Sequence, residues 1–291
     1  VGGYDGTNPH STVWSASIKS DGTIGTFSTL TYLPAARRDP AITAFNGYIY
    51  VTGGSVDGTT HHSTVYSAPI NSDGTIGTFS TLTYLPAARG IHTISSSNGY
   101  MFIMGGSNSF VTGAQSTVYS TPLKSTALAV NTSNSFAQGN LLDLWNNNAS
   151  KFAVDYNGNV TTQGSYISDV VPKGDGTTGS WATTVALPSS ATRIQHSAVA
   201  YNQYLYVLGG LNDIPGLGVG QSTVYSAPIK SDGTTSTYST LTYLPGVRYR
   251  QGNVAYNGYL FVIGGRNGST AQSTVWSAPI KSDGTIGHLL L

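Results

Sequence analysis

Arginine recurs at one position of a repeated segment of this chain, shortly before a predicted strand. Its four copies are Arg37, Arg89, Arg193 and Arg248. A guanidinium group can bind a carboxylate through two parallel hydrogen bonds. The four residues are therefore predicted to bind a ligand that carries a carboxylate, such as an acidic sugar. The alternative is that they support loops by hydrogen bonding to backbone carbonyls, and the sequence leaves both interpretations open.

Histidine follows this arginine by three residues in two of the copies, as His92 and His196. The other two copies have Pro40 and Gln251 at the same position. Two histidines without a cysteine or a carboxylate at ligand spacing do not make a convincing zinc site. We expect His92 and His196 to be structural or to line a channel, and we expect no metal and no cofactor.

Asp-Gly-Thr turns also recur, and they raise the question of calcium binding. One carboxylate per turn is far from the roughly six or more oxygen ligands that calcium takes. An aspartate that accepts hydrogen bonds within its own turn explains the pattern better. We expect this local role for Asp21, Asp73, Asp232 and Asp283.

The repeat itself is visible by eye. The string SDGTIGTFSTLTYLPAAR occupies residues 20–37 and returns unchanged at 72–89. A Gly-Gly pair closes an apolar run five times, and the first glycines of successive pairs are 51, 52, 104 and 55 residues apart. One interval is therefore doubled. Because Val1 falls inside a repeat, we expect these residues to be part of something longer.

Each copy predicts four short strands. The first follows the arginine, the second is the apolar run before the glycines, the third reads TVYSAPI or TVWSAPI, and the fourth reads TFSTLTYLP. Tyr, Val, Ile, Thr and Phe dominate, and no window has a helical period. Asn-Gly at Asn46, Asn98 and Asn257 is typical of a tight hairpin turn. The fold is predicted to be all-β.

The order of these features resembles the kelch family. It runs Arg, a gap, His, then Asn-Gly-Tyr, a hydrophobic run, Gly-Gly, and later a Tyr or Trp before Leu-Pro. The resemblance implies a kelch-like β-propeller with about five four-stranded blades. First strands would line a central channel, so the four arginines would form a cationic rim there. It implies no single function, because such propellers include enzymes, adhesins and scaffolds.

Residues 125–165 belong to no copy of the repeat. Leu142 and Leu144, and later Phe152 and Val154, alternate with polar residues, which predicts a small β-hairpin or a three-stranded element. The string NLLDLWNNNASKFAVDYNGNVTTQG resembles stalk modules of phage tail fibres and bacterial surface proteins. That resemblance implies oligomerisation or spacing along a fibre.

The predicted domain organisation follows from this break in the repeat. Whether the insert interrupts one propeller or joins two is left open. We assign propeller blades to 1–124, the insert to 125–165, and further propeller blades to 166–291.

Glutamate and cysteine are absent, and all 12 acidic residues are aspartates. A glycosidase with paired glutamates and any chemistry that needs a thiolate are thereby excluded.

Only 9% of residues are charged and the net charge is +1, so nothing favours nucleic acid or an anionic membrane as partner. No apolar stretch approaches the roughly 18 residues of a membrane span. Catalysis needs a unique set of groups, which near-identical repeats do not offer, so we expect no enzyme.

The loops after the Gly-Gly pairs differ most between copies. They read YDGTNPH, SVDGTTHH, SNSFVTGAQ, LNDIPGLGVGQ and RNGSTAQ. Such variation on near-identical strands indicates either contact with a ligand or drift without constraint. Glycosylation sequons occur at Asn131, Asn148, Asn159 and Asn267.

These features, with the low charge and the Ser, Thr and Asn content, predict an extracellular, cell-surface or virion-surface protein. We predict a non-catalytic surface or fibre module that presents its variable loops to a glycan or a protein, as an adhesin does, and that self-associates into a fibre or oligomer. The alternatives are a purely structural subunit of an extracellular filament and, less favoured, a carbohydrate-active enzyme.

Overall fold

The computed structural model describes residues 1–21, 23–57, 59–109, 113–125, 140–146, 149–155, 160–162, 174–188, 192–212 and 218–290. These residues form 23 strands and no helix, which confirms the all-β prediction. The chain divides into two compact units, one of residues 1–124 with 176–291 and one of residues 125–175. Within the described part, no helix is long and apolar enough to cross a membrane.

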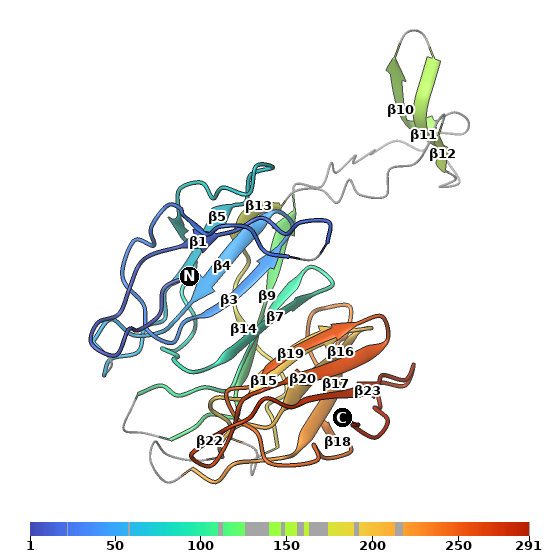
Figure 1. The fold of residues 1–291 in the computed structure, drawn as a ribbon. Helices are drawn as coiled ribbons and strands as arrows, with labels where there is room; N and C mark the ends of the chain where they lie inside the picture. Colours follow the sequence, from blue (N-terminus) through green and yellow to red (C-terminus); the bar gives the residue numbers. More distant parts are fainter. Residues whose placement is uncertain are drawn as a thin grey trace. The chain divides into compact units, whose positions relative to one another are not determined.

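The first unit consists of antiparallel sheets that follow one another along the chain (Figure 1). Four sheets are blades of a β-propeller, and a two-stranded sheet precedes them. Blade 1 holds β3 (Ala41–Phe45), β4 (Tyr48–Thr52), β5 (Val65–Pro69) and β6 (Ser80–Thr81). Blade 2 holds β7 (Thr93–Ser97), β8 (Tyr100–Met104), β9 (Val118–Ser125), β13 (Gly174–Thr178) and β14 (Ala182–Thr183).

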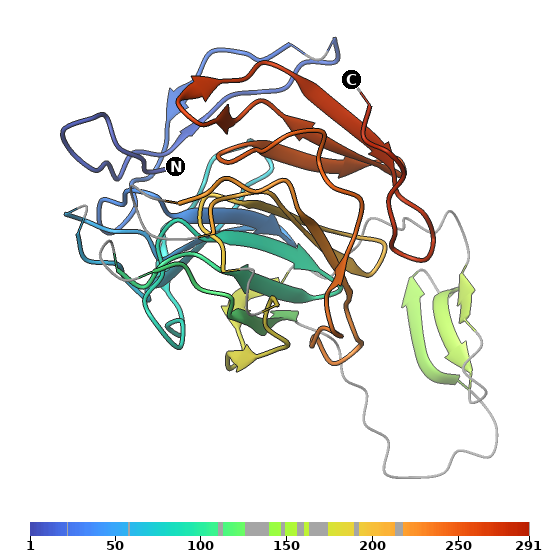
Figure 2. The ribbon, with the colours of Figure 1, turned by 90° about the horizontal axis from the view of Figure 1, so that it is seen from below.

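The series continues to the end of the chain, from blue to red in Figure 2. Blade 3 holds β15 (Ser197–Tyr201), β16 (Tyr204–Leu208), β17 (Val224–Pro228) and β18 (Ser239–Thr240). Blade 4 holds β19 (Gly252–Tyr256), β20 (Tyr259–Ile263) and β23 (Val275–Pro279), with a hairpin of β21 (Arg266–Asn267) and β22 (Thr270–Ala271) between the last two. Residues 1–33, with β1 (Trp14–Ser15) and β2 (Ser28–Thr29), are called the N-terminal half-blade below.

The described residues show four complete blades and one incomplete one, where about five blades were expected. Five Gly-Gly pairs are present, but only four are preceded by a hairpin of first and second strands. The pair at Gly2 belongs to the N-terminal half-blade, which has only the two outer strands of a blade. The described residues therefore form four blades and one half-blade.

The insert interrupts blade 2. Strand β14 pairs with β9, with Ala182 opposite Ser120, although residues 125–175 intervene in the sequence. The third and fourth strands of one blade thus flank the insert, so it does not join two propellers. The predicted three-stranded element is present in this second unit as β10 (Asn140–Asn146), β11 (Ala149–Asp155) and β12 (Val160–Thr162).

Tight hairpins connect the first and second strands of each blade, as the Asn-Gly pairs predict. Asn46 and Gly47 have φ angles of 48° and 77°, both in the left-handed region that a type I′ turn requires. Asn98 and Asn257 adopt the same conformation, with φ of 52° and 48°. The turn residues therefore set the register of the inner hairpin.

The Gly-Gly pairs join adjacent blades. The N–H group of Gly54 donates a hydrogen bond to the carbonyl oxygen of Arg89 in the next blade, at 2.8 Å. A Cβ atom on Gly53 would lie 2.2 Å from that same oxygen, so only glycine fits. The same bond joins the other blades, from Gly3 to Arg37, from Gly106 to Arg193 and from Gly210 to Arg248.

The hydrophobic core lies between blades and is divided into four clusters. One cluster combines Phe102 and Met104 of blade 2 with Leu205 and Val207 of blade 3. Alternate residues of the second strands of blades 1, 2 and 3 therefore pack on opposite neighbours, which explains why these strands are apolar on both faces.

Candidate functional site

The four predicted arginines are buried and bind within their own blades. In Arg89, Nη1 donates to the carbonyl oxygen of Ala88 at 2.9 Å, and Nη2 donates to Thr117 Oγ1 at 2.6 Å and to Tyr119 Oη at 3.0 Å. Its guanidinium carbon lies 5.1 Å from the centre of the Tyr119 ring. Exposed fractions are 2% for Arg37, 2% for Arg89, 1% for Arg193 and 4% for Arg248.

The other three arginines repeat this arrangement. Each Nη1 donates to the preceding carbonyl, and each Nη2 donates to the threonine that immediately precedes the third strand, respectively Thr64, Thr223 and Thr274. This finding corrects the expectation of a ligand-binding rim at Arg37, Arg89, Arg193 and Arg248. Their guanidinium groups are enclosed and hydrogen bonded, and they have the supporting role that was the alternative interpretation.

His92 and His196 connect blades. Nε2 of His92 lies 2.8 Å from Thr52 Oγ1, and Nε2 of His196 lies 2.8 Å from Thr93 Oγ1, in each case across a blade boundary. Burial, with a nearby arginine as the second cause, lowers the pKa of both imidazoles to about 3. Gln251 replaces them in blade 4 and donates to the carbonyl oxygen of Leu208 at 2.8 Å. Both histidines are therefore neutral near pH 7.

A cavity of about 1170 Å³ opens among the Gly-Gly loops of the first unit. Its walls come from the half-blade and from all four blades, and they include the loops after three of the Gly-Gly pairs. A volume of this order is that of a ligand-binding cleft. Its charged lining residues are Arg38, Asp39, Arg250 and Arg266. The neutral His92 and His196 also line it.

Four cavity residues share one repeat position and an unusual backbone. Asp39, Ile91, Gln195 and Arg250 each follow a buried arginine by two residues and have φ between 51° and 56°. Positive φ is uncommon outside glycine and marks a constrained site, above all for β-branched Ile91. The constraint is a series of backbone bonds between blades, with N–H groups donating from Ile91 to Asp39, from Gln195 to Ile91 and from Arg250 to Gln195.

The near-identical blades thus hold four different side chains at the cavity: a carboxylate, an alkyl group, an amide and a guanidinium. This position was not among the predicted site residues. Its signal was available, since the residue two after the constant arginine differs in all four copies.

The cavity is rich in arginine. The chain has seven arginines; four are the buried ones, and the other three, Arg38, Arg250 and Arg266, all line the cavity. Arg38 Nε lies 3.1 Å from Asp39 Oδ2, and its guanidinium lies over the Tyr4 ring at 4.2 Å. Arg250 is exposed and has no side-chain hydrogen bond to the described residues. The lining therefore carries a surplus of positive charge.

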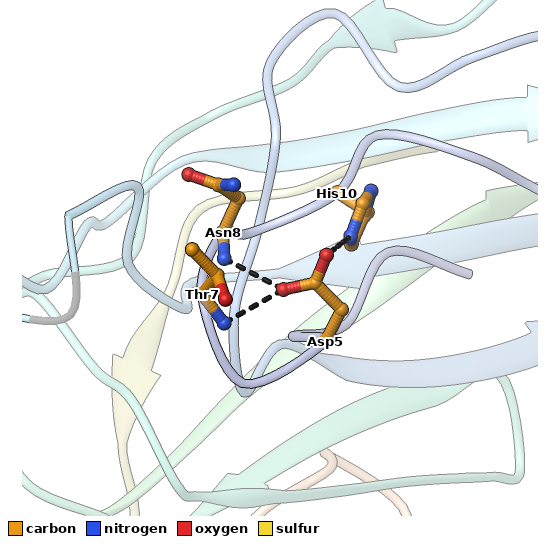
Figure 3. Close-up of polar contacts among 4 residues, drawn as sticks. All are labelled: Asp5, Thr7, Asn8 and His10. Carbon is orange, nitrogen blue, oxygen red and sulfur yellow. Dashed lines mark hydrogen bonds and ion pairs between the residues drawn. The ribbon is translucent and has the colours of Figure 1, made fainter.

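Aspartates fix two of the variable loops. In the first loop, Asp5 Oδ1 accepts hydrogen bonds from the N–H groups of Thr7 and Asn8, both at 2.7 Å, and Oδ2 lies 2.9 Å from His10 Nε2 (Figure 3). The two backbone bonds are the main cause that lowers the pKa of Asp5 to about 2. Asp57 closes the second loop in the same way. These loops are held in defined conformations.

The remaining predicted residues are the glycosylation sequons and the aspartates of the Asp-Gly-Thr turns. Asn267 is exposed on β21 and lines the cavity. The Asp-Gly-Thr turns close on themselves as expected; Thr23 donates to Asp21 Oδ1 through both its N–H and its hydroxyl group. Three sequons, at Asn131, Asn148 and Asn159, lie outside the described residues.

Comparisons with known proteins agree with this architecture. The model of the Kelch motif matches residues 248–277, from the buried arginine of blade 4 into its third strand. A comparison with curated protein sequences gives no match. A solved structure entitled "Structure of YjhT" aligns with a TM-score of 0.61 and 12% identity, over 100% of this chain and 83% of that chain. At this identity the likeness concerns the fold.

The repeated sheets, their Gly-Gly joints and the cavity at the loop end define a β-propeller. Within this propeller, residues 248–277 match the Kelch motif, and the pattern of arginine, Asn-Gly-Tyr and Gly-Gly recurs in blades 1 and 2.

Proposed function

We propose that this protein is a non-catalytic binding module of an extracellular or cell surface, and that its cavity binds a glycan carrying carboxylate or sulfate groups. The observation that carries this proposal is the cluster of Arg38, Arg250 and Arg266 in one cavity. Only 13 lysines and arginines occur in the chain, so three in one lining is a strong concentration of positive charge. Guanidinium groups suit planar anions such as carboxylates.

Two features favour binding over catalysis. General acid and base chemistry requires groups that exchange protons near the working pH. The cavity's carboxylate, Asp39, is ion-paired with Arg38, and burial keeps His92 and His196 neutral. A panel of glycosidase and lyase substrates tests this point, and turnover of any of them would contradict the proposal.

A low content of charged residues and a high content of Ser, Thr and Asn support an extracellular setting. The absence of cysteine is compatible with it. The second unit, with its three-stranded sheet, supplies a separate element for oligomer contacts. Detection of the protein on intact cells or particles by surface labelling is the measurement for this part of the proposal.

A glycan array with matched acidic and neutral sugars tests the ligand. We expect acidic glycans to bind and their affinity to fall with salt, because the contacts are ionic. The Arg250→Ala variant should lose about tenfold or more in affinity. Lys281→Ala removes the same charge at an exposed site outside the cavity and is the matched control. Equal binding of neutral glycans, or of Arg250→Ala, would contradict the proposal.

A structural subunit of an extracellular filament is the second candidate. The observation in its favour is exposed apolar surface on blade 4 and on the N-terminal half-blade, including Val275 and Trp14. Electron microscopy of the protein from its source distinguishes the two. Continuous fibres with regular spacing support the filament, and isolated particles support the binding module.

A further inference from the structure

The backbone around the cavity is strained at one position of every blade. Asp39, Ile91, Gln195 and Arg250 each follow the buried arginine of their blade by two residues and have φ between 51° and 56°. In this left-handed region the Cβ atom of an L-residue crowds the following carbonyl oxygen, a cost that glycine avoids. The conformation is rarest for a β-branched residue such as Ile91. All four residues line the cavity, and they are called the cavity arc below.

Elsewhere the described chain meets the same backbone requirement with residues that tolerate it. Positive φ is adopted by asparagine and glycine in the hairpin turns, as at Asn46 and Gly47, and by the Gly-Gly pairs at the joints between blades. Gln203 replaces the hairpin glycine, but in one blade only. In the cavity arc, all four blades have neither glycine nor asparagine. A strained conformation that is kept in every copy is typical of a binding site, where the side chain is needed.

The four residues of the cavity arc are linked to one another through the backbone. The N–H group of Ile91 donates to the carbonyl oxygen of Asp39 at 3.4 Å, and that of Gln195 donates to the carbonyl oxygen of Ile91 at 3.4 Å. The N–H group of Arg250 donates to the carbonyl oxygen of Gln195 at 2.8 Å. One backbone hydrogen bond thus separates each residue from the next, so a single ligand can contact neighbouring side chains. Because these bonds hold the backbone, a substitution changes the chemistry of the cavity wall and not its course.

The side chains of the cavity arc differ in what they can bind. Arg250 is exposed at one end and offers a guanidinium group, which suits a carboxylate or a sulfate. Gln195 beside it is partly buried and carries an amide, which exchanges hydrogen bonds with hydroxyl and amide groups. Ile91 offers an alkyl group, which suits the C–H face of a sugar ring. Asp39, at the other end, lies 3.1 Å from Arg38 Nε and positions that arginine.

We infer that the cavity arc sets the ligand specificity of this propeller. Arg250 binds the acid group of the glycan, Gln195 binds a hydroxyl or amide group next to it, and Ile91 packs on the apolar face of the sugar ring. The Gly-Gly loops shape the cavity, and the side chains of the arc decide which glycan it accepts. This inference rests on the proposed function, because it assigns parts of the same acidic glycan to individual residues.

Exchange of side chains along the arc tests specificity on an array of acidic glycans. Arg250→Gln should weaken binding about tenfold or more. Gln195→Arg places a second guanidinium beside the first and should favour glycans with two acid groups over those with one by about tenfold. The double variant Gln195→Arg, Arg250→Gln keeps the charge and should regain binding with a changed order of preference. Ser282→Arg adds the same charge at an exposed site outside the cavity and should keep the wild-type profile.

Urea unfolding tests the strain without any ligand. Arg250→Gly should unfold at a higher urea concentration than Arg250→Ala, because glycine adopts the left-handed conformation without a Cβ contact. At the exposed Lys281, where φ is not positive, the glycine variant should instead unfold at a lower urea concentration than the alanine variant.

Three results would overturn the inference. The first is an Arg250→Gly variant that is no more stable than Arg250→Ala. The second is an unchanged array profile of Arg250→Gln and Gln195→Arg when the wild type binds acidic glycans, and the proposed function would then stand. The third is a wild type that binds no acidic glycan, which would overturn the proposed function as well.

Discussion

Arg248 and Arg250 lie two residues apart but in opposite environments. Arg248 is 4% exposed and packs over Trp276, whereas Arg250 is exposed at the cavity with a φ of 56°. The left-handed conformation of Arg250 changes the direction of the backbone directly after Arg248 and Tyr249. The repeat therefore uses one arginine to hold the blade together and the variable position beside it to equip the cavity.

Stability measurements should separate the two arginines. Arg248→Ala removes hydrogen bonds to Val247 and Thr274 and leaves space under Trp276, so it should lower the free energy of unfolding by about 2 kcal/mol or more. Arg250→Ala should change it by less than about 0.5 kcal/mol, as for other exposed sites. Urea unfolding followed by circular dichroism measures both. Equal destabilisation would show that Arg250 also supports the fold.

Conservative truncation tests the packing of the repeat. Val224→Ala removes buried methyl groups between blades 3 and 4 and should cost about 2 kcal/mol. Val275→Ala makes the identical change at the identical repeat position and should cost under about 0.5 kcal/mol, because that side chain faces solvent. Thermal unfolding of the two variants gives the comparison. Similar losses would mean that the Val275 side chain is covered in solution.

Much of the scaffold was predictable from the sequence because the same turn and strand patterns recur from repeat to repeat. The Asn-Gly turns, the four-strand pattern and the Gly-Gly joints each follow from local chemistry that recurs every 50 residues or so. The alternation at Leu142 and Phe152 likewise predicted the strands of the insert.

The candidate site was less predictable. The repeated Arg89 was predicted to bind a ligand, although a residue present in every blade is more typical of a structural contact than of a unique binding site. Arg250 and Arg266 come together in the cavity only through the closure of the propeller, which no local pattern reveals.

Glycine substitutions test the joint between blades. Gly53→Ala places a Cβ atom 2.2 Å from the Arg89 carbonyl oxygen, and we expect a loss of about 3 kcal/mol or more in unfolding free energy. Gly74→Ala has a similar positive φ, 79° against 58°, but meets nothing within 4 Å. It should cost only the backbone strain of about 1 kcal/mol. Chemical denaturation of both variants isolates the steric contact, and equal losses would argue against the joint.

His92 and His196 should make the fold sensitive to acid. Burial lowers the pKa of His92 and His196 to about 3 in the folded state, with Arg89 and Arg193 nearby, against about 6.5 in the unfolded chain. Between these pH values the unfolded state binds more protons than the folded state. The free energy of unfolding therefore increases with pH across this window and decreases as the pH falls below about 6.5. Aspartates such as Asp5, whose pKa is also lowered, add a further loss only below about pH 4.

Glutamine at both positions should flatten this dependence, since Gln251 already joins blades 3 and 4 without a titrating group. We expect the unfolding free energy of the His92→Gln, His196→Gln double variant to change much less than that of the wild type between pH 6.5 and 4.5 in urea titrations. His288→Gln, at an exposed site, is the control and should follow the wild type. Parallel curves for the wild type and the double variant would show that protonation of these imidazoles does not limit the acid stability of the propeller.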